Sequence, residues 1–192
     1  MRLFSSLYDM AIRWSRHRHA PGYLFGLSFA ESSFFPIPPD VMLAPMTLAT
    51  PERAWRLALL TTIGSVLGGL LGYSIGLFAF DYIEPLLHRA GYWERYLTTR
   101  AWFDTWGFWA VFLAGFSPIP YKLFTISAGV ISMALLPFVA ASAIGRGARF
   151  FLVAGVMAWG GARMESTLRE YIDRIGWLVV LLAVLVFFLV ER

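Results

Sequence analysis

Residues 36–40 of the chain are Pro-Ile-Pro-Pro-Asp, and residues 118–122 are Pro-Ile-Pro-Tyr-Lys. Each copy interrupts a long apolar stretch, which covers residues 21–50 around the first copy and residues 107–145 around the second. A proline inside a helix removes a backbone donor and clashes with the preceding turn, so it tends to end the helix. We therefore predict an internal repeat of two helix–break–helix units, with the breaks at Pro36, Pro38, Pro118 and Pro120.

The length of the second stretch indicates how these units meet a membrane. Residues 107–145 carry Lys122 as their only charged residue. As one helix they would extend about 58 Å, which is too long for one membrane crossing and short for two crossings with a loop. We predict that residues 21–50 and 107–136 form re-entrant hairpins, each of which enters and leaves the membrane on one side.

Between the two hairpins, residues 57–80 contain no charged residue and would extend about 36 Å as a helix, enough to cross a bilayer. Within this segment a glycine recurs at every fourth position, which places these residues on one helix face and favours close packing of another helix. The glycines are Gly64, Gly68, Gly72 and Gly76. Because a single crossing separates the hairpins, they should enter from opposite faces, in the inverted-topology repeat that many transporters use.

The remaining segments complete an all-α integral membrane protein. We expect an amphipathic interfacial helix over residues 1–20, with packing on the protein's own edge as the alternative. One membrane domain should then cover residues 21–192, with an interfacial linker at 81–106, rich in Trp and Tyr, and further spans at 137–162 and 175–190. Arginines are concentrated in residues 1–20, 51–56 and 163–174, so these segments and the N-terminus are predicted to be cytoplasmic.

The composition excludes several classes of protein. Of the 192 residues, 58% are hydrophobic and 15% are charged, which is too apolar for a soluble domain, a disordered chain or a nucleic-acid binder. The chain has no cysteine and three histidines, so a metal site is not expected. We find no nucleophile–base set, and we expect neither an enzyme nor a cofactor.

Few charged residues lie inside the apolar segments. Each of them is expected to be paired or functional, because an unpaired charge in a membrane is costly. Asp40 and Lys122 occupy corresponding positions of the repeat with opposite charge, so we expect them to pair if the hairpin tips meet. Burial of Glu31 would favour its protonated form and allow it to carry a proton. Arg146 and Arg149 lie on one helical face and suit a phosphate or carboxylate group. The structural alternatives are that an Asp40–Lys122 pair only docks the hairpins, and that Arg146 and Arg149 pair with Glu31 and Asp40 for stability alone.

Several of these motifs together resemble the DedA family of bacterial inner-membrane proteins, also called SNARE-associated or VTT-domain proteins, and in particular its short YqaA-like branch. The resemblance covers about residues 20–190. It rests on the acidic residue before the first break, the glycine-rich span, residues 116–122 (FSPIPYK), Ala128-Gly129 and residues 145–149 (GRGAR). One departure is that Ser117 and Pro118 stand where the family usually has the first of two arginines.

The resemblance implies a lipid flippase or scramblase of the inner membrane that depends on the proton gradient. It makes Glu31 and Asp40 the essential acidic pair, and we expect them to exchange the proton. Lys122, Arg146 and Arg149 would bind the head group of a phospholipid or a polyprenyl phosphate. Two alternatives are a transporter of small cations or drugs and a scaffold that transports nothing. Membrane lipids and protons are the expected partners, nucleic acid is not, and the sequence leaves homo-oligomer formation open.

Overall fold

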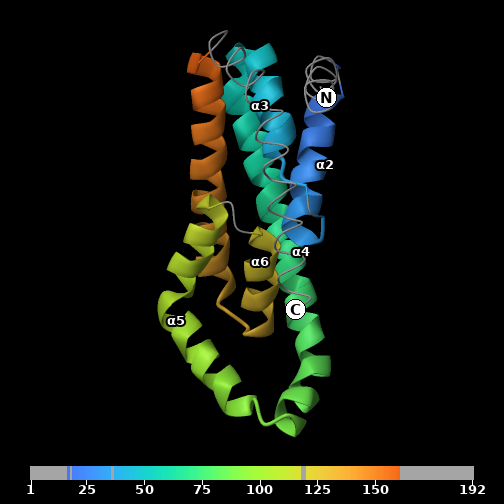
Figure 1. The fold of residues 1–192 in the computed structure, drawn as a ribbon, viewed down its shortest axis with the longest axis vertical. Helices are drawn as coiled ribbons and strands as arrows, with labels where there is room; N and C mark the ends of the chain where they lie inside the picture. Colours follow the sequence, from blue (N-terminus) through green and yellow to red (C-terminus); the bar gives the residue numbers. More distant parts are fainter. Residues whose placement is uncertain (1–16, 18, 36, 118–119, 161–192) are drawn as a thin grey trace, which may run out of the picture.

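The computed structural model describes residues 17, 19–35, 37–117 and 120–160 (Figure 1). Five predicted features therefore lie wholly or partly outside the described residues. They are the interfacial helix over 1–20, the prolines Pro36 and Pro118, the last two residues of the 137–162 span, the cytoplasmic segment 163–174, and the 175–190 span.

The described residues form helices joined by short connections, and they contain no strand. The all-α prediction is confirmed for this part of the chain. The elements are α2 (Ala20–Ser33), α3 (Asp40–Ala49), the 3-10 turn η1 (Pro51–Arg53), α4 (Ala54–Arg89), α5 (Trp93–Phe116), α6 (Tyr121–Val130) and a helix over Leu135–Gly160.

Both apolar stretches are broken where the sequence predicts a break. The first helix ends at Ser33 and α3 begins at Asp40, whereas α5 ends at Phe116 and α6 begins at Tyr121. In Figure 1, α2 and α3 lie beside the N-terminal half of α4, and α6 lies beside its C-terminal half. Entry of the two hairpins into a membrane from opposite faces stays a prediction, because the structure contains no membrane.

The two long helices extend further than the sequence indicated. The expected linker over 81–106 is the end of α4 and the first half of α5, joined by a turn in which Gly91 has a φ of 72°. Pro85 lies inside α4 without ending it, and Pro45 lies inside α3 in the same way. One interior proline removes one backbone hydrogen bond, and packing against neighbouring helices can offset that loss.

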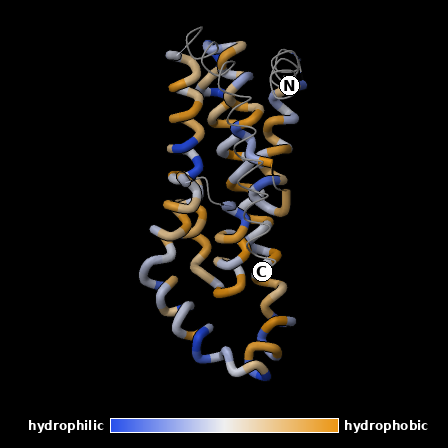
Figure 2. The backbone as a smooth tube through the Cα atoms, viewed as in Figure 1, coloured by the Kyte–Doolittle hydropathy of each residue, from blue (hydrophilic) through white to orange (hydrophobic). Residues whose placement is uncertain are grey.

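Hydropathy along the chain agrees with a membrane environment. The helices Pro51–Arg89 and Leu135–Gly160 are both long and apolar enough to cross a membrane. Figure 2 shows hydrophobic residues along these helices, with a hydrophilic stretch midway along Leu135–Gly160. That stretch contains Arg146 and Arg149, so the charges lie in the interior of an apolar bundle.

The glycine stripe of α4 is the surface on which both hairpins pack. Gly64 and Gly68 lie against α2, and Gly72 and Gly76 lie against α6. A Cβ atom at Gly68 would overlap the carbonyl oxygen of Phe29, which is backbone and cannot move away by changing a rotamer. The absence of a side chain at these positions therefore permits the close approach of three helices.

Replacement of Gly68 by alanine should destabilise the protein by about 1–3 kcal/mol, because the added methyl group meets backbone atoms. Gly26 is the matched control, since a Cβ there has no neighbouring atom within 4 Å. Gly26→Ala should leave stability unchanged or raise it by up to about 1 kcal/mol. Thermal unfolding of the detergent-solubilised protein measures both, and equal midpoints for the two variants would contradict this packing.

Candidate functional site

The charged residues of the apolar segments gather where the two helix breaks meet. Glu31 lies in the last turn of α2, and Asp40 is the first residue of α3. Arg146 and Arg149 lie in the middle of the Leu135–Gly160 helix and face these two carboxylates. Two carboxylate–guanidinium pairs therefore connect the first hairpin to the last described helix.

The inner pair, Arg146 and Glu31, is buried, with side chains 3% and 11% exposed. The Arg146 Nη2 group donates to Glu31 Oε2, and Arg146 Nε donates to Ser65 Oγ at 2.6 Å. The Ser32 hydroxyl donates to Glu31 Oε2 at 3.1 Å and lies 2.7 Å from Ser65 Oγ. Hydrogen bonds from neighbouring hydroxyls offset part of the cost of removing these charges from water.

Two aromatic rings contact the same guanidinium. The Arg146 Cζ atom lies 5.0 Å from the centroid of the Tyr121 ring and 4.7 Å from that of Phe150. The Tyr121 hydroxyl donates to Ser142 Oγ, and Ser142 donates in turn to the carbonyl oxygen of Phe138 at 2.7 Å. Cation–π contacts are strongest in such desolvated settings, so Arg146 is fixed in place.

The outer pair, Arg149 and Asp40, is more accessible, with side chains 20% and 22% exposed and a distance of 2.8 Å between Nη2 and Oδ2. Arg149 Nη1 also donates to the carbonyl oxygen of Ser117 at 2.5 Å, at the C-terminal end of α5. Asp40 lies at the N-terminal end of α3. Each charge therefore lies at the helix end whose dipole favours it.

One oxygen of this outer pair has no partner. Asp40 Oδ1 is buried and accepts no hydrogen bond in the described part of the chain. Glu31 differs, because both Arg146 and Ser32 donate to its carboxylate. A buried oxygen without a donor is poorly stabilised, so the outer pair is less completely hydrogen-bonded than the inner pair.

The predicted pairing of Asp40 with Lys122 is wrong. Asp40 pairs with Arg149, whereas Lys122 Nζ donates to the carbonyl oxygen of Phe34 at 3.4 Å. Phe34 caps the C-terminal end of α2, where the helix dipole attracts a cation. The tips of the hairpins do meet, but through this bond and through Thr125 Oγ1, which donates to the carbonyl oxygen of Ser32 at 3.3 Å.

Of the predicted break residues, Pro38 and Pro120 lie within the described chain. Both are exposed, and their carbonyl oxygens accept hydrogen bonds from the first turns of α3 and α6. Val41 N donates to Pro38 at 3.3 Å, and Leu123 N donates to Pro120 at 3.2 Å. Each proline therefore lies at a helix start, where a missing N–H group costs little.

The sequence analysis missed the hydroxyl groups that surround the inner pair. Ser32, Ser65, Tyr121 and Ser142 complete the hydrogen bonds and ring contacts of the buried charges. Two of them had a signal in the sequence, because Ser32 follows Glu31 and Ser65 lies within the glycine stripe. In the described part of the chain, no group of three or more metal-ligating side chains is present.

Comparison with known proteins identifies the family. The VTT domain matches residues 37–159, which include the end of the first helix break, the whole second break, and Arg146 and Arg149. The chain belongs to the VTT-domain family, also called the DedA family. The predicted resemblance is therefore confirmed.

Relatives within the family include proteins of similar length. An uncharacterised protein of Haemophilus influenzae is 48% identical over 192 residues, with all of both chains covered. Undecaprenyl phosphate transporter A of Staphylococcus aureus is 27% identical over 85% of this chain and 86% of its own. The inner membrane protein YqaA of Escherichia coli is 28% identical over 71% of this chain and 93% of its own. No solved structure matches the chain.

Proposed function

We propose that this protein moves an anionic lipid with a phosphate head group across the bacterial inner membrane, coupled to the movement of protons. The observation that supports this most is the outer pair, a partly accessible arginine held by a carboxylate with one unsatisfied oxygen. The names of two relatives, an undecaprenyl phosphate transporter and an inner membrane protein, point to the same class of substrate and the same location.

The charge of the site favours an anion as substrate. Arg146 and Arg149 pair with the two carboxylates Glu31 and Asp40, and a third cation, Lys122, binds the carbonyl end of α2. The surplus positive charge would attract a phosphate and repel a small cation or a cationic drug. The alternative of a cation transporter is therefore less well supported than an anionic lipid carrier.

Protonation of Asp40 would free Arg149 to bind the phosphate of the lipid. Protonation neutralises the carboxylate, so Arg149 loses its ionic partner and its planar guanidinium can bind a phosphate with two parallel hydrogen bonds. Lys122, whose Nζ donates to the carbonyl oxygen of Phe34, would supply a second cation. Loss of the proton restores the Asp40–Arg149 pair and displaces the phosphate, which couples lipid release to proton release.

The hydrocarbon chain of the lipid needs no polar path. Large apolar side chains of α4 are exposed on the outside of the bundle, among them Leu59, Ile63 and Phe78. The tail would stay in contact with such surfaces and with the bilayer, so only the head group passes through the charged region between the helix breaks.

Arg149→Gln should lower transport of an anionic lipid by about 10–100-fold, the loss expected for one pair of charge-assisted hydrogen bonds. The measurement uses phosphatidylcholine vesicles that contain the purified protein and a fluorescent phosphatidic acid with its label on the acyl chain. Dithionite, which quenches label in the outer leaflet only, reports the transfer of lipid between leaflets.

The matched control is Arg56→Gln, which removes an exposed arginine of α4 outside the site. This variant should transport at the wild-type rate. If Arg149→Gln also transports at that rate while it remains folded, the proposal fails. Faster transport of a cationic label in Arg149→Gln would instead support the cation carrier.

A further inference from the structure

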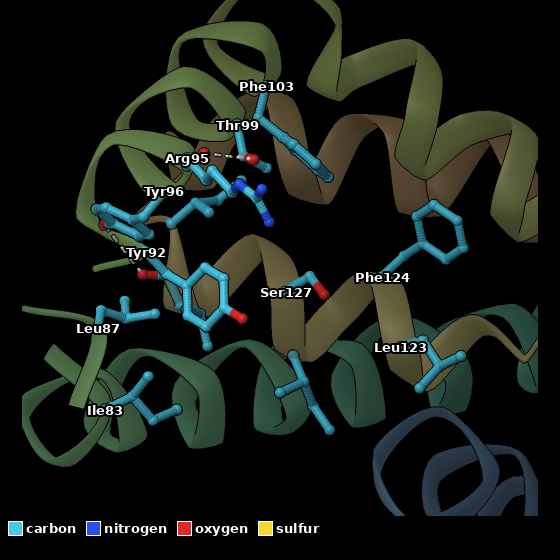
Figure 3. Close-up of a pocket in the computed structure, with 13 residues that line it drawn as sticks. Ile83, Leu87, Tyr92, Arg95, Tyr96, Thr99, Phe103, Leu123, Phe124 and Ser127 are labelled. Atoms are coloured by element: carbon cyan, nitrogen blue, oxygen red, sulfur yellow. Dashed lines mark hydrogen bonds between the residues drawn. The ribbon is translucent and has the colours of Figure 1, made fainter. Parts of the chain in front are cut away.

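A second feature lies away from the charged site, at the end of the molecule where α4 and α5 join. A cavity of about 570 Å³ opens between the C-terminal end of α4, the first half of α5, and α6 (Figure 3). Its walls are mainly apolar, as at Ile83, Leu87 and Phe124. The volume is typical of cavities that bind small molecules, and it is large enough for a hydrocarbon chain.

One cation projects into this apolar cavity. Figure 3 shows the Arg95 guanidinium pointing inward from α5 towards Ser127 on α6. Its Cζ atom lies 5.4 Å from the centroid of the Tyr92 ring, and the Thr99 hydroxyl fixes the backbone by donating to the Arg95 carbonyl oxygen at 2.8 Å. Both ion pairs of the described chain belong to the other site, so Arg95 has no carboxylate partner there. An arginine without such a partner, next to an apolar surface, suits an anionic amphiphile.

The cavity has a polar end and an apolar end. Tyr92, Trp93 and Tyr96 lie near the turn between α4 and α5, and such residues gather where a membrane meets water. At the opposite end the lining residue Leu123 is the neighbour in sequence of Lys122, which belongs to the charged site. A lipid in one leaflet has the same polarity, with its head group at the interface and its chain directed to the middle of the membrane.

We infer that this cavity binds a phosphate-bearing lipid, with the phosphate on Arg95 and the hydrocarbon chain along α6 towards Leu123. The inference rests on the proposed function, since it gives the transported lipid a site next to the charged region. It adds a binding site of its own, formed by α5 and α6 rather than by the two ion pairs. A lipid bound there has its chain directed towards Lys122 and its head group at the end of the molecule where α4 and α5 join.

Binding is measurable apart from transport. The full chain with Arg149→Gln, which weakens the charged site, is purified in detergent and titrated with geranylgeranyl phosphate, and bound lipid is counted by native mass spectrometry. Adding Arg95→Gln should weaken binding about tenfold, the loss expected for a charge-assisted hydrogen bond. The uncharged alcohol geranylgeraniol should bind weakly and equally to both proteins.

Arg100→Gln is the matched control, because this exposed arginine lies on α5 but does not line the cavity. Equal affinities for the Arg95 and Arg100 variants would overturn the inference. In a second test, Ser127→Phe fills the cavity and should abolish binding of the phosphate and the alcohol, whereas Thr98→Phe, outside the cavity, should not. Unchanged binding in Ser127→Phe would also overturn it.

The chain's own apolar residues 175–190 are a competing occupant. Because the sequence has no cysteine, Ser127→Cys combined with Ala183→Cys gives a clean disulfide test. A high yield of this crosslink in membranes would overturn the lipid assignment, and its absence supports it. If the wild-type protein binds the lipid through Arg95 but moves no lipid in vesicles, the proposed function fails and the binding site stands.

Discussion

Arg146→Gln should destabilise the protein by about 3–5 kcal/mol, the largest effect expected of any single replacement in the site. The variant leaves the carboxylate of Glu31, which is 11% exposed, without its guanidinium. It also removes the cation between the rings of Tyr121 and Phe150. Thermal unfolding in detergent measures the effect, and the expected result is a fall in midpoint of many degrees or failure to accumulate folded protein.

The double replacement Glu31→Gln with Arg146→Gln distinguishes a lost charge from lost packing. Two neutral amides leave no unpaired ion, so the double variant should be more stable than either single variant. Ser32 and Ser65 remain as hydrogen-bond partners for the amides. If the double variant is as unstable as Arg146→Gln alone, the ring contacts and not the ion pair hold this region together.

Much of the fold could be predicted because a membrane restricts what a sequence can do. The two Pro-Ile-Pro motifs located both helix breaks, and the four-residue spacing of Gly64 to Gly76 located the face on which two hairpins pack. The bounds of α4 and α5 were harder to predict. Charged and aromatic residues over 81–106 indicate an interface, but they do not tell whether the backbone there is helical, which tertiary packing decides.

The charged residues of the site could be predicted, and their pairing in part, since the pairing of the two arginines with Glu31 and Asp40 was the structural alternative. Scarcity of charge identified Glu31, Asp40, Arg146 and Arg149, since a buried charge needs a partner. The repeat suggested that Asp40 would meet Lys122, because they are corresponding positions of opposite charge near the tips of the two hairpins. The structure places Lys122 at the carbonyl end of α2 instead. Which cation meets which carboxylate depends on how far each hairpin penetrates, and sequence spacing does not reveal that.

Replacement of Asp40 should affect transport more than stability, because the inner pair of Glu31 is buried and the outer pair of Asp40 is more accessible. Asp40→Asn keeps the shape of the side chain at a site that is 22% exposed, so the protein should fold with nearly the wild-type unfolding midpoint. It removes the group that we propose takes up the proton. We expect lipid transfer in vesicles to fall at least about tenfold and to lose its response to a transmembrane pH gradient.

Glu52→Gln in η1 is the matched control, since this exposed glutamate lies outside the site, and it should transport and respond to the gradient as the wild type does. If the protein were instead a scaffold in which these charges only dock the hairpins, every variant that keeps its stability should also keep its function. A folded Asp40→Asn protein with normal, gradient-dependent transport would therefore remove Asp40 from the mechanism. The proton would then have to be carried by Glu31, whose carboxylate is the better satisfied of the two.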